Sequence, residues 1–176
     1  MKHLIIPVLA LAVLSSCTIK DTFQSKPNAD ITAKGPIVTR NLQLDQFSTI
    51  EVSSAVEIKY TQHPGNVSAT LSCPEDIIPY YIFTVSGNKL IAKAKDNTNI
   101  CLKDMKIVLT VSSSDLTSIN MSGSSAFETE SLATRNFTLI ASGASEFNAG
   151  SLSATDMTLT ASGSSELDIN TLQSTT

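Results

Sequence analysis

Hydrophobic and polar residues alternate with a period of two in several short segments of the chain. In one of them, Phe137, Leu139 and Ala141 would face one way, and Thr138 and Ile140 the other. Period-two alternation in short runs that end at glycine is typical of β-strands, whereas helices would show a period near 3.6. The pattern therefore predicts an all-β protein.

The alternating pattern recurs every twenty residues in the last third of the chain. The segment 132–151 is followed by a similar segment, 152–171, and the landmarks return in three registers. A fixed period of this size indicates coils that stack and bury one another's apolar faces, with equivalent residues about 4.8 Å apart. We expect a parallel β-helix, a solenoid of coils of about twenty residues. Its turn glycines would be Gly123, Gly143 and Gly163.

The middle of the chain follows the pattern less regularly. The segment 47–56 echoes 116–127 and suggests an earlier, degenerate coil. Residues 81–94 alternate on both sides of a Ser-Gly-Asn-Lys turn and predict a hairpin, and 107–111 predicts another strand. We therefore expect one domain over 36–176, with a β-rich irregular half at 36–111 and regular coils at 112–176.

The first residues indicate export. A short basic start precedes an apolar run, 4–14, that is too short to span a bilayer as a helix. The following Leu14-Ser15-Ser16-Cys17 resembles a bacterial lipobox. We expect a signal peptide at 1–16, lipidation of Cys17, and a flexible tether at 17–35. A lipid anchor in the outer membrane then follows, facing the periplasm or the cell surface.

Two cysteines remain after this processing. Cys73 and Cys101 would lie in an oxidising compartment, where a disulfide between them would contribute roughly 3 kcal/mol. Two unconnected thiols are the equal alternative. Neither cysteine has a neighbour at zinc-like spacing, and His63 is the one histidine after Cys17, so we expect neither a metal nor a cofactor.

The net charge and the distribution of Ser and Thr limit the classes of function that the chain could have. The formal net charge of −4 argues against nucleic-acid binding. Ser and Thr are concentrated after Val111, where stacked coils tolerate small hydroxyl side chains better than stacked charges. Within this acidic region, the repeat predicts an outer-face ladder of Glu128, Asn148, Asp168, Glu146 and Glu166.

A catalytic site is hard to build from these residues. A polysaccharide lyase or hydrolase needs gathered carboxylates and a basic group, and Arg135 is the one basic residue of the repeats. The chain has no Gly-x-Ser-x-Gly elbow, and its Ser-Gly-Ser motif recurs as a structural turn would. Tyr60, Tyr80 and Tyr81 could stack on sugars if exposed together, although core packing suits the strand pattern better. We therefore expect no enzyme.

The chain also resembles a known family. The opening Leu44-Asp-Gln-Phe47-Ser-Thr-Ile50-Glu-Val52, then Val56-Glu-Ile58 and the repeated Ser-Gly turns, are similar to the autotransporter adhesin head called the GIN domain. The resemblance begins near Asn41 and implies a right-handed single-stranded parallel β-helix in a secreted lipoprotein. It brings no catalytic or binding residues. Members usually continue beyond a third coil, whereas this sequence stops after Leu172, which would leave an open coil.

These observations favour a non-enzymatic, lipid-anchored envelope protein with an adhesin-like role. Its polar ladders would contact a glycan or a protein, and the open end of the β-helix would allow self-association. A carbohydrate-active β-helix enzyme and a purely structural envelope module are the alternatives.

Overall fold

The computed structural model describes residues 29–65 and 67–174, and this part of the chain is almost entirely β-structure. The elements, in chain order, are β1 (Ala29–Thr32), β2 (Ile37–Asn41), β3 (Thr49–Val52), β4 (Val56–Gln62), β5 (Ser68–Pro74), the 3-10 helix η1 (Glu75–Tyr80), β6 (Tyr81–Ser86), β7 (Lys89–Ala94), β8 (Thr98–Cys101), β9 (Ile107–Ser113), β10 (Ser118–Met121), β11 (Ala126–Ala141), β12 (Glu146–Ala161) and β13 (Glu166–Ser174).

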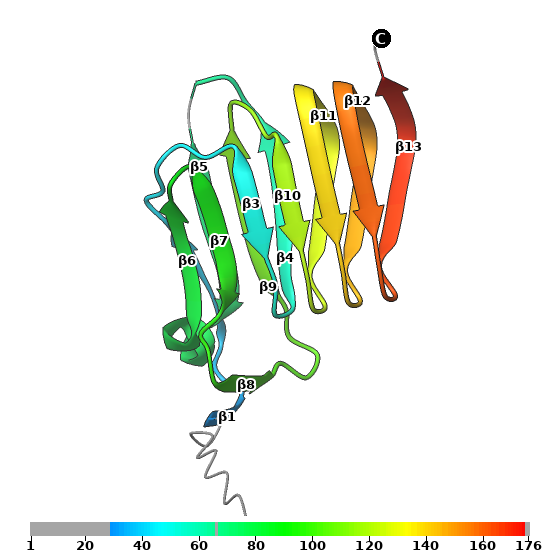
Figure 1. Ribbon diagram of the computed structural model, residues 1–176. Helices are drawn as coiled ribbons and strands as arrows, with labels where there is room; N and C mark the ends of the chain where they lie inside the picture. Colours follow the sequence, from blue (N-terminus) through cyan, green and yellow to red (C-terminus); the bar gives the residue numbers. More distant parts are fainter. Residues whose placement is uncertain (1–28, 66, 175–176) are drawn as a thin grey trace, which may run out of the picture.

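Eleven of the described strands form one sheet in the order β2-β5-β9-β4-β11-β10-β3-β7-β6, with β12 on β11 and β13 on β12. The long strand β11 pairs with β4 through its first residues and with β10 through its last. The sheet therefore curls into a half-barrel with two walls (Figure 1). The first wall comprises β2, β5, β9, β4, β13 and the first parts of β11 and β12. The second wall comprises β6, β7, β3, β10 and the last parts of β11 and β12.

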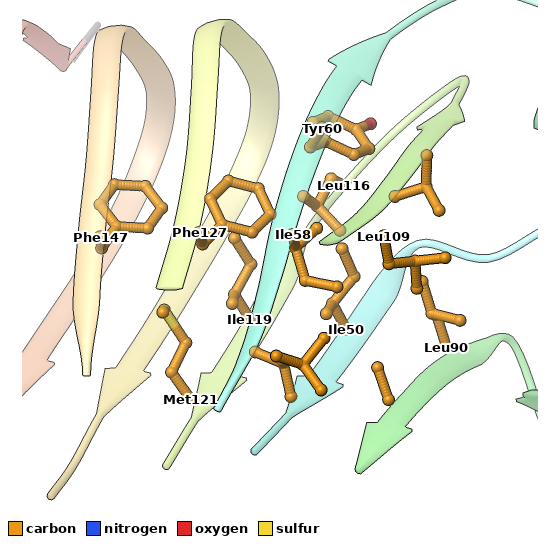
Figure 2. Packing of buried hydrophobic residues seen from close by; sticks show 14 of the residues in the cluster. Ile50, Ile58, Tyr60, Leu90, Leu109, Leu116, Ile119, Met121, Phe127 and Phe147 are labelled. Atoms are coloured by element: carbon orange, nitrogen blue, oxygen red, sulfur yellow. The ribbon is translucent and has the colours of Figure 1, made fainter. Parts of the chain in front are cut away.

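The core lies between the two walls, as the alternating pattern requires. Ile58 and Phe127 project from the first wall, Ile50 and Ile119 project from the second, and all four are fully buried (Figure 2). Burial of such side chains contributes about 1.5–3 kcal/mol each. The outward neighbours of these residues are mostly polar, so each strand has one face in the core and one in water.

The twenty-residue register is confirmed in the strand pairing. Phe127 pairs with Phe147 and Phe147 with Leu167, in parallel strands. The weaker echo is confirmed as well, because Ile50 of β3 pairs with Ile119 of β10. The predicted hairpin at 81–94 is the antiparallel pair β6–β7, and the strand expected at 107–111 is β9.

The prediction of a right-handed single-stranded parallel β-helix solenoid is wrong. The sheet is a curled, mixed half-barrel in which β2 runs antiparallel to β5, β5 to β9, and β6 to β7. The physical reason is that alternation shows which face of a strand is buried and leaves open the direction in which its neighbour runs.

An insertion between β4 and β10 closes the end of the half-barrel opposite β13. In it, β7 pairs parallel with β3, and β9 pairs parallel with β4. The antiparallel strands β6 and β5 then pair with the outer edges of β7 and β9. Figure 1 shows β5, β6 and β7 at one end of the molecule and β13 at the other.

The segment predicted as a tether lies partly in the described residues. Its residues 29–32 form β1, which pairs parallel with β8, and Ala33 is buried. The backbone N–H of Ala33 donates to the carbonyl oxygen of Cys101 at 3.0 Å. Residues 1–28, and with them the predicted signal peptide and Cys17, lie outside the described residues.

Candidate functional site

The predicted ladder residues lie side by side on the outer face of the first wall. Glu128 pairs with Asn148 and Asn148 with Asp168, and Glu146 pairs with Glu166. Their neighbours Phe127, Phe147 and Leu167 point inward, so alternation turns the ladder side chains outward. All four carboxylates of the ladder are exposed.

The ladder borders an open hollow of about 460 Å³. Three successive strands contribute to its lining, which is mostly polar. The lining residues are Glu128, Thr129, Glu130, Glu146, Asn148, Ala149, Gly150, Asp168 and Asn170. Glu166 is the one ladder residue outside this lining.

Gly150 makes room for the hollow. It occupies the position that Glu130 holds on β11 and Asn170 on β13, and it is the one glycine of that row. A Cβ at residue 150 would lie 2.6 Å from the carbonyl oxygen of Glu130, too close for any side chain. The chain therefore passes close to its neighbour here, and residue 150 contributes backbone without a side chain to the lining of the hollow.

Lysine side chains form ion pairs with carboxylates at one side of the hollow only. The Nζ of Lys59 lies 3.2 Å from Oε2 of Glu128 and 3.5 Å from Oε1 of Glu57. The hydrogen bond to Glu128, together with the attraction of both carboxylates, raises the pKa of Lys59 above its usual value. The Nζ of Lys106 lies 3.1 Å from Oε2 of Glu57.

The other side of the hollow carries uncompensated negative charge. In the described residues, no cation forms an ion pair with Glu130, Glu146 or Asp168. The side-chain amide of Asn148 donates to Oε1 of Glu146 at 2.7 Å, which fixes the amide. The hollow thus offers hydrogen-bond acceptors to a ligand that brings O–H or N–H donors.

The carboxylates are not arranged for metal binding. Within residues 29–65 and 67–174, no group of three or more His, Cys, Asp or Glu side chains could hold a metal ion. All four ladder carboxylates are exposed to water.

The turn glycines have a structural task. Gly123, Gly143 and Gly163 have φ of +69°, +73° and +71°, and each begins the turn between the walls. In the same turns, the hydroxyl groups of Ser125, Ser145 and Ser165 donate to the carbonyl oxygens three residues earlier, at 3.0, 3.0 and 2.7 Å. Turn geometry therefore explains why Ser recurs at these three positions.

The other candidates lie away from the hollow or inside the core. Cys73 on β5 is buried, Cys101 on β8 is exposed, and both are free thiols. Burial raises the pKa of the Cys73 thiol above its usual value. Tyr60 and Tyr81 are buried, so they form no exposed platform for sugars, and His63 is exposed beside its turn.

Sequence reasoning missed Lys59, Glu130 and Gly150. Glu130 follows Glu128 by two positions, so alternation alone could have added it to the outer face. Gly150 interrupts the row formed with Glu130 and Asn170, which was a signal of close backbone approach. Lys59 could have been found only by aligning 47–60 with 116–129, which places it beside Glu128.

Comparison with solved structures identifies similar folds. A putative adhesin from Parabacteroides merdae is 18% identical with a TM-score of 0.74, and the match covers 82% of this chain and 60% of that one. A putative adhesin from Parabacteroides distasonis is 17% identical with a TM-score of 0.72, covering 81% and 60%. A putative lipid binding protein from the same species is 16% identical with a TM-score of 0.63, covering 74% and 62%. The chain thus spans about 60% of the length of these structures.

Three further findings bear on the identity of the chain. A search of curated proteins finds no match. Among the described residues, no helix has the length and apolar character needed to cross a membrane. A family model described as "Putative auto-transporter adhesin, head GIN domain" matches residues 46–174. The match extends over more than half of the sequence and includes the hollow and all five ladder residues, and the chain belongs to this family.

Proposed function

We propose that this chain is a non-enzymatic, adhesin-like binding module of the bacterial cell envelope, and that the ladder hollow binds a neutral or amino-bearing glycan. One observation carries the proposal. Side chains from three successive strands, among them Glu128, Glu146, Asn148 and Asp168, line one open hollow that is rich in hydrogen-bond acceptors. Sugar hydroxyl groups and ammonium groups are the donors that such a surface accepts.

The sign of the charge selects the class of glycan. Glu130, Glu146 and Asp168 lack a paired cation in the described residues, so an anionic polysaccharide would be repelled. A neutral polysaccharide is not repelled, and the ammonium group of an amino sugar is attracted to these carboxylates. The family match and the similar folds of two putative adhesins support a binding role.

Binding to immobilised glycans tests this proposal. The expected result is saturable binding of neutral or amino-bearing glycans that is lowered about tenfold or more by Glu146→Gln or Asp168→Asn, because each removes a charged acceptor. Glu51→Gln is the matched control: it changes a carboxylate on the outer face of the second wall, where Glu51 pairs with Lys89 at 3.1 Å. Absence of glycan binding would contradict the proposal.

The same assay separates the enzymatic alternative. Glycan fragments that accumulate with the unchanged chain and disappear with Asp168→Asn would show a carbohydrate-active enzyme. Binding without fragments, lost in the ladder variants, is the outcome that we expect. Binding of a basic protein in place of every glycan would contradict the glycan proposal and point to a protein ligand.

We further propose that Cys17 carries a lipid that holds the domain at the outer membrane. The lipobox-like 14–17 and the apolar run before it support this anchor. Cys17→Ala should move the protein from the membrane fraction to the soluble fraction. Unchanged fractionation would contradict lipid anchoring.

A further inference from the structure

A second hollow, of about 330 Å³, lies beside the turn that joins β3 to β4. The segment between β8 and β9, residues 102–106, contributes to its other side (Figure 1). Most of its lining residues are apolar, and they are Ala55, Val56, Leu102, Met105, Ile107 and Ala126. The charged lining residues are Glu57, Lys103 and Lys106, and we call this the lysine hollow. A mostly apolar lining with a few charged groups is typical of ligand pockets.

The backbone is strained on both sides of the lysine hollow. Ala55 has φ of +61° and Lys103 has φ of +53°, a conformation that costs an L-residue about 1–2 kcal/mol. Among the described residues, Asn88 and Asn97 also have positive φ, but asparagine tolerates this region far better than alanine or lysine. Strained backbone of this kind clusters at ligand sites, so these two residues support a binding role for the hollow.

The lysine hollow carries more positive than negative charge. The Nζ of Lys106 donates to Oε2 of Glu57 at 3.1 Å, and 76% of the Lys106 side chain remains exposed. Lys103 is exposed and forms no ion pair with any of the described residues. Two ammonium groups therefore face one carboxylate, which Glu57 also shares with Lys59. An anionic group of a ligand would be attracted here.

The lysine hollow adjoins the ladder hollow. Between the two lies a third hollow of about 240 Å³. It shares Lys106 and Ala126 with the lysine hollow, and Glu146 and Asn148 with the ladder hollow. Ala126 pairs with Glu146, so a methyl group occupies the position on β11 that a long side chain holds on β12. One groove therefore has a surplus of lysine at one end and a surplus of carboxylate at the other.

We propose that the lysine hollow is a second subsite of the glycan site, and that the ligand is a zwitterionic glycan, an oligosaccharide with both a carboxylate and an amino group. This inference rests on the proposed function of the ladder hollow. Charge complementarity sets the orientation: the carboxylate binds Lys103 and Lys106, and the amino group binds at Glu146 and Asp168. A glycan with carboxylates along its whole length would be repelled at the ladder.

Isothermal titration calorimetry with two probes tests this proposal. The first probe is an oligomer of glucosamine, and the second is the same oligomer with one carboxymethyl group on the sugar at one end. The test variant combines Lys103→Asn with Lys106→Gln, and asparagine suits the left-handed backbone at residue 103. The matched control is Lys95→Gln, because Lys95 is exposed, forms no ion pair with the described residues and does not line the groove.

The unchanged chain and Lys95→Gln should bind the carboxymethylated oligomer about fivefold or more tightly than the plain one. The double variant should lose this difference, and it should keep or raise its affinity for the plain oligomer, because lysines repel ammonium groups. Equal affinities of the unchanged chain for both probes, or a difference that persists in the double variant, would overturn the second subsite without affecting the proposal for the ladder hollow. Binding of neither probe would overturn the proposed function and this inference with it.

Discussion

The two ends of the half-barrel have the same alternation of inward apolar and outward polar residues, but they differ in what covers their outermost strands. At the end formed by the insertion, Leu90 of β7 and Leu109 of β9 are fully buried, because antiparallel strands cover their edges. At the other end, Leu159 and Leu167 hold equivalent inward positions and remain partly exposed. The burial of a tier in this fold therefore depends on what lies on its outer side.

The largest effect is expected where the two regions meet. Phe127 is fully buried, with its ring centroid 5.9 Å from that of Tyr60 and 5.3 Å from that of Phe147 (Figure 2). Phe127→Ala should lower the free energy of unfolding by about 3–5 kcal/mol in chemical denaturation. Leu167→Ala, at the same position on the open tier, should cost about 1–2 kcal/mol. Equal losses would show that the two ends are equally well packed.

The turns provide the second comparison. Gly143 has φ +73°, and a Cβ there would lie 2.8 Å from the carbonyl oxygen of Gly123 in the tier below. Gly87, in the β6–β7 hairpin, has φ +56° with nothing within 4 Å of a Cβ. Gly143→Ala should therefore cost about 2–4 kcal/mol and Gly87→Ala about 1 kcal/mol. A reversed order in thermal or chemical unfolding would contradict the close stacking of the turns.

Alkaline pH should act on the covered end. Burial raises the pKa of Tyr81 to about 12, and its hydroxyl group donates to the carbonyl oxygen of Ser54 at 2.8 Å. The unfolded chain ionises this phenol near pH 10, so its contribution to stability is complete below about pH 10 and is lost as the pH rises to about 12. Over this range the unchanged chain should lose about 1–2 kcal/mol more than Tyr81→Phe.

Denaturation of both chains at several pH values from about 9 to about 12 measures this difference. Tyr60, whose pKa burial also raises, titrates in both chains and cancels in the comparison. Parallel losses in the two chains would mean that Tyr81 is not held in its neutral form by the fold.

The smallest effect concerns the turn serines. Ser145 is 1% exposed and donates to the carbonyl oxygen of Ser142 at 3.0 Å, whereas Ser165 makes the same contact in the partly exposed last turn. Ser145→Ala should lower the free energy of unfolding by about 1 kcal/mol and Ser165→Ala by about 0.3 kcal/mol, because water replaces an exposed hydrogen bond. Equal values would remove the distinction between the two turns.

Much of the fold could be predicted because the chain repeats itself. The recurrence of Gly123 at Gly143 and Gly163 fixes the register of β10 to β13, and the echo of 47–56 at 116–127 correctly places β3 beside β10. Strand direction could not be predicted in this way. The strand β5 alternates Ala69, Leu71 and Cys73 inward as a parallel coil would, yet it runs antiparallel to β9.

The row of ladder residues could be predicted from the sequence, whereas the hollow that the row borders could not. Register alone places Glu128, Asn148 and Asp168 beside one another. The hollow depends on the close backbone approach at Gly150, and its charge depends on Lys59, which comes from a strand sixty-nine residues before Glu128. That contact follows from the pairing of β4 with β11, which the echo of 47–56 at 116–127 would have placed only if it had been extended to residue 59.

Amide hydrogen exchange tests the contrast between the two ends most directly. In dilute solution, β4 and β9 should be the best-protected strands, and protection should fall through β11 and β12 to β13, the fastest to exchange. Protection of β13 equal to that of β9 would contradict the account.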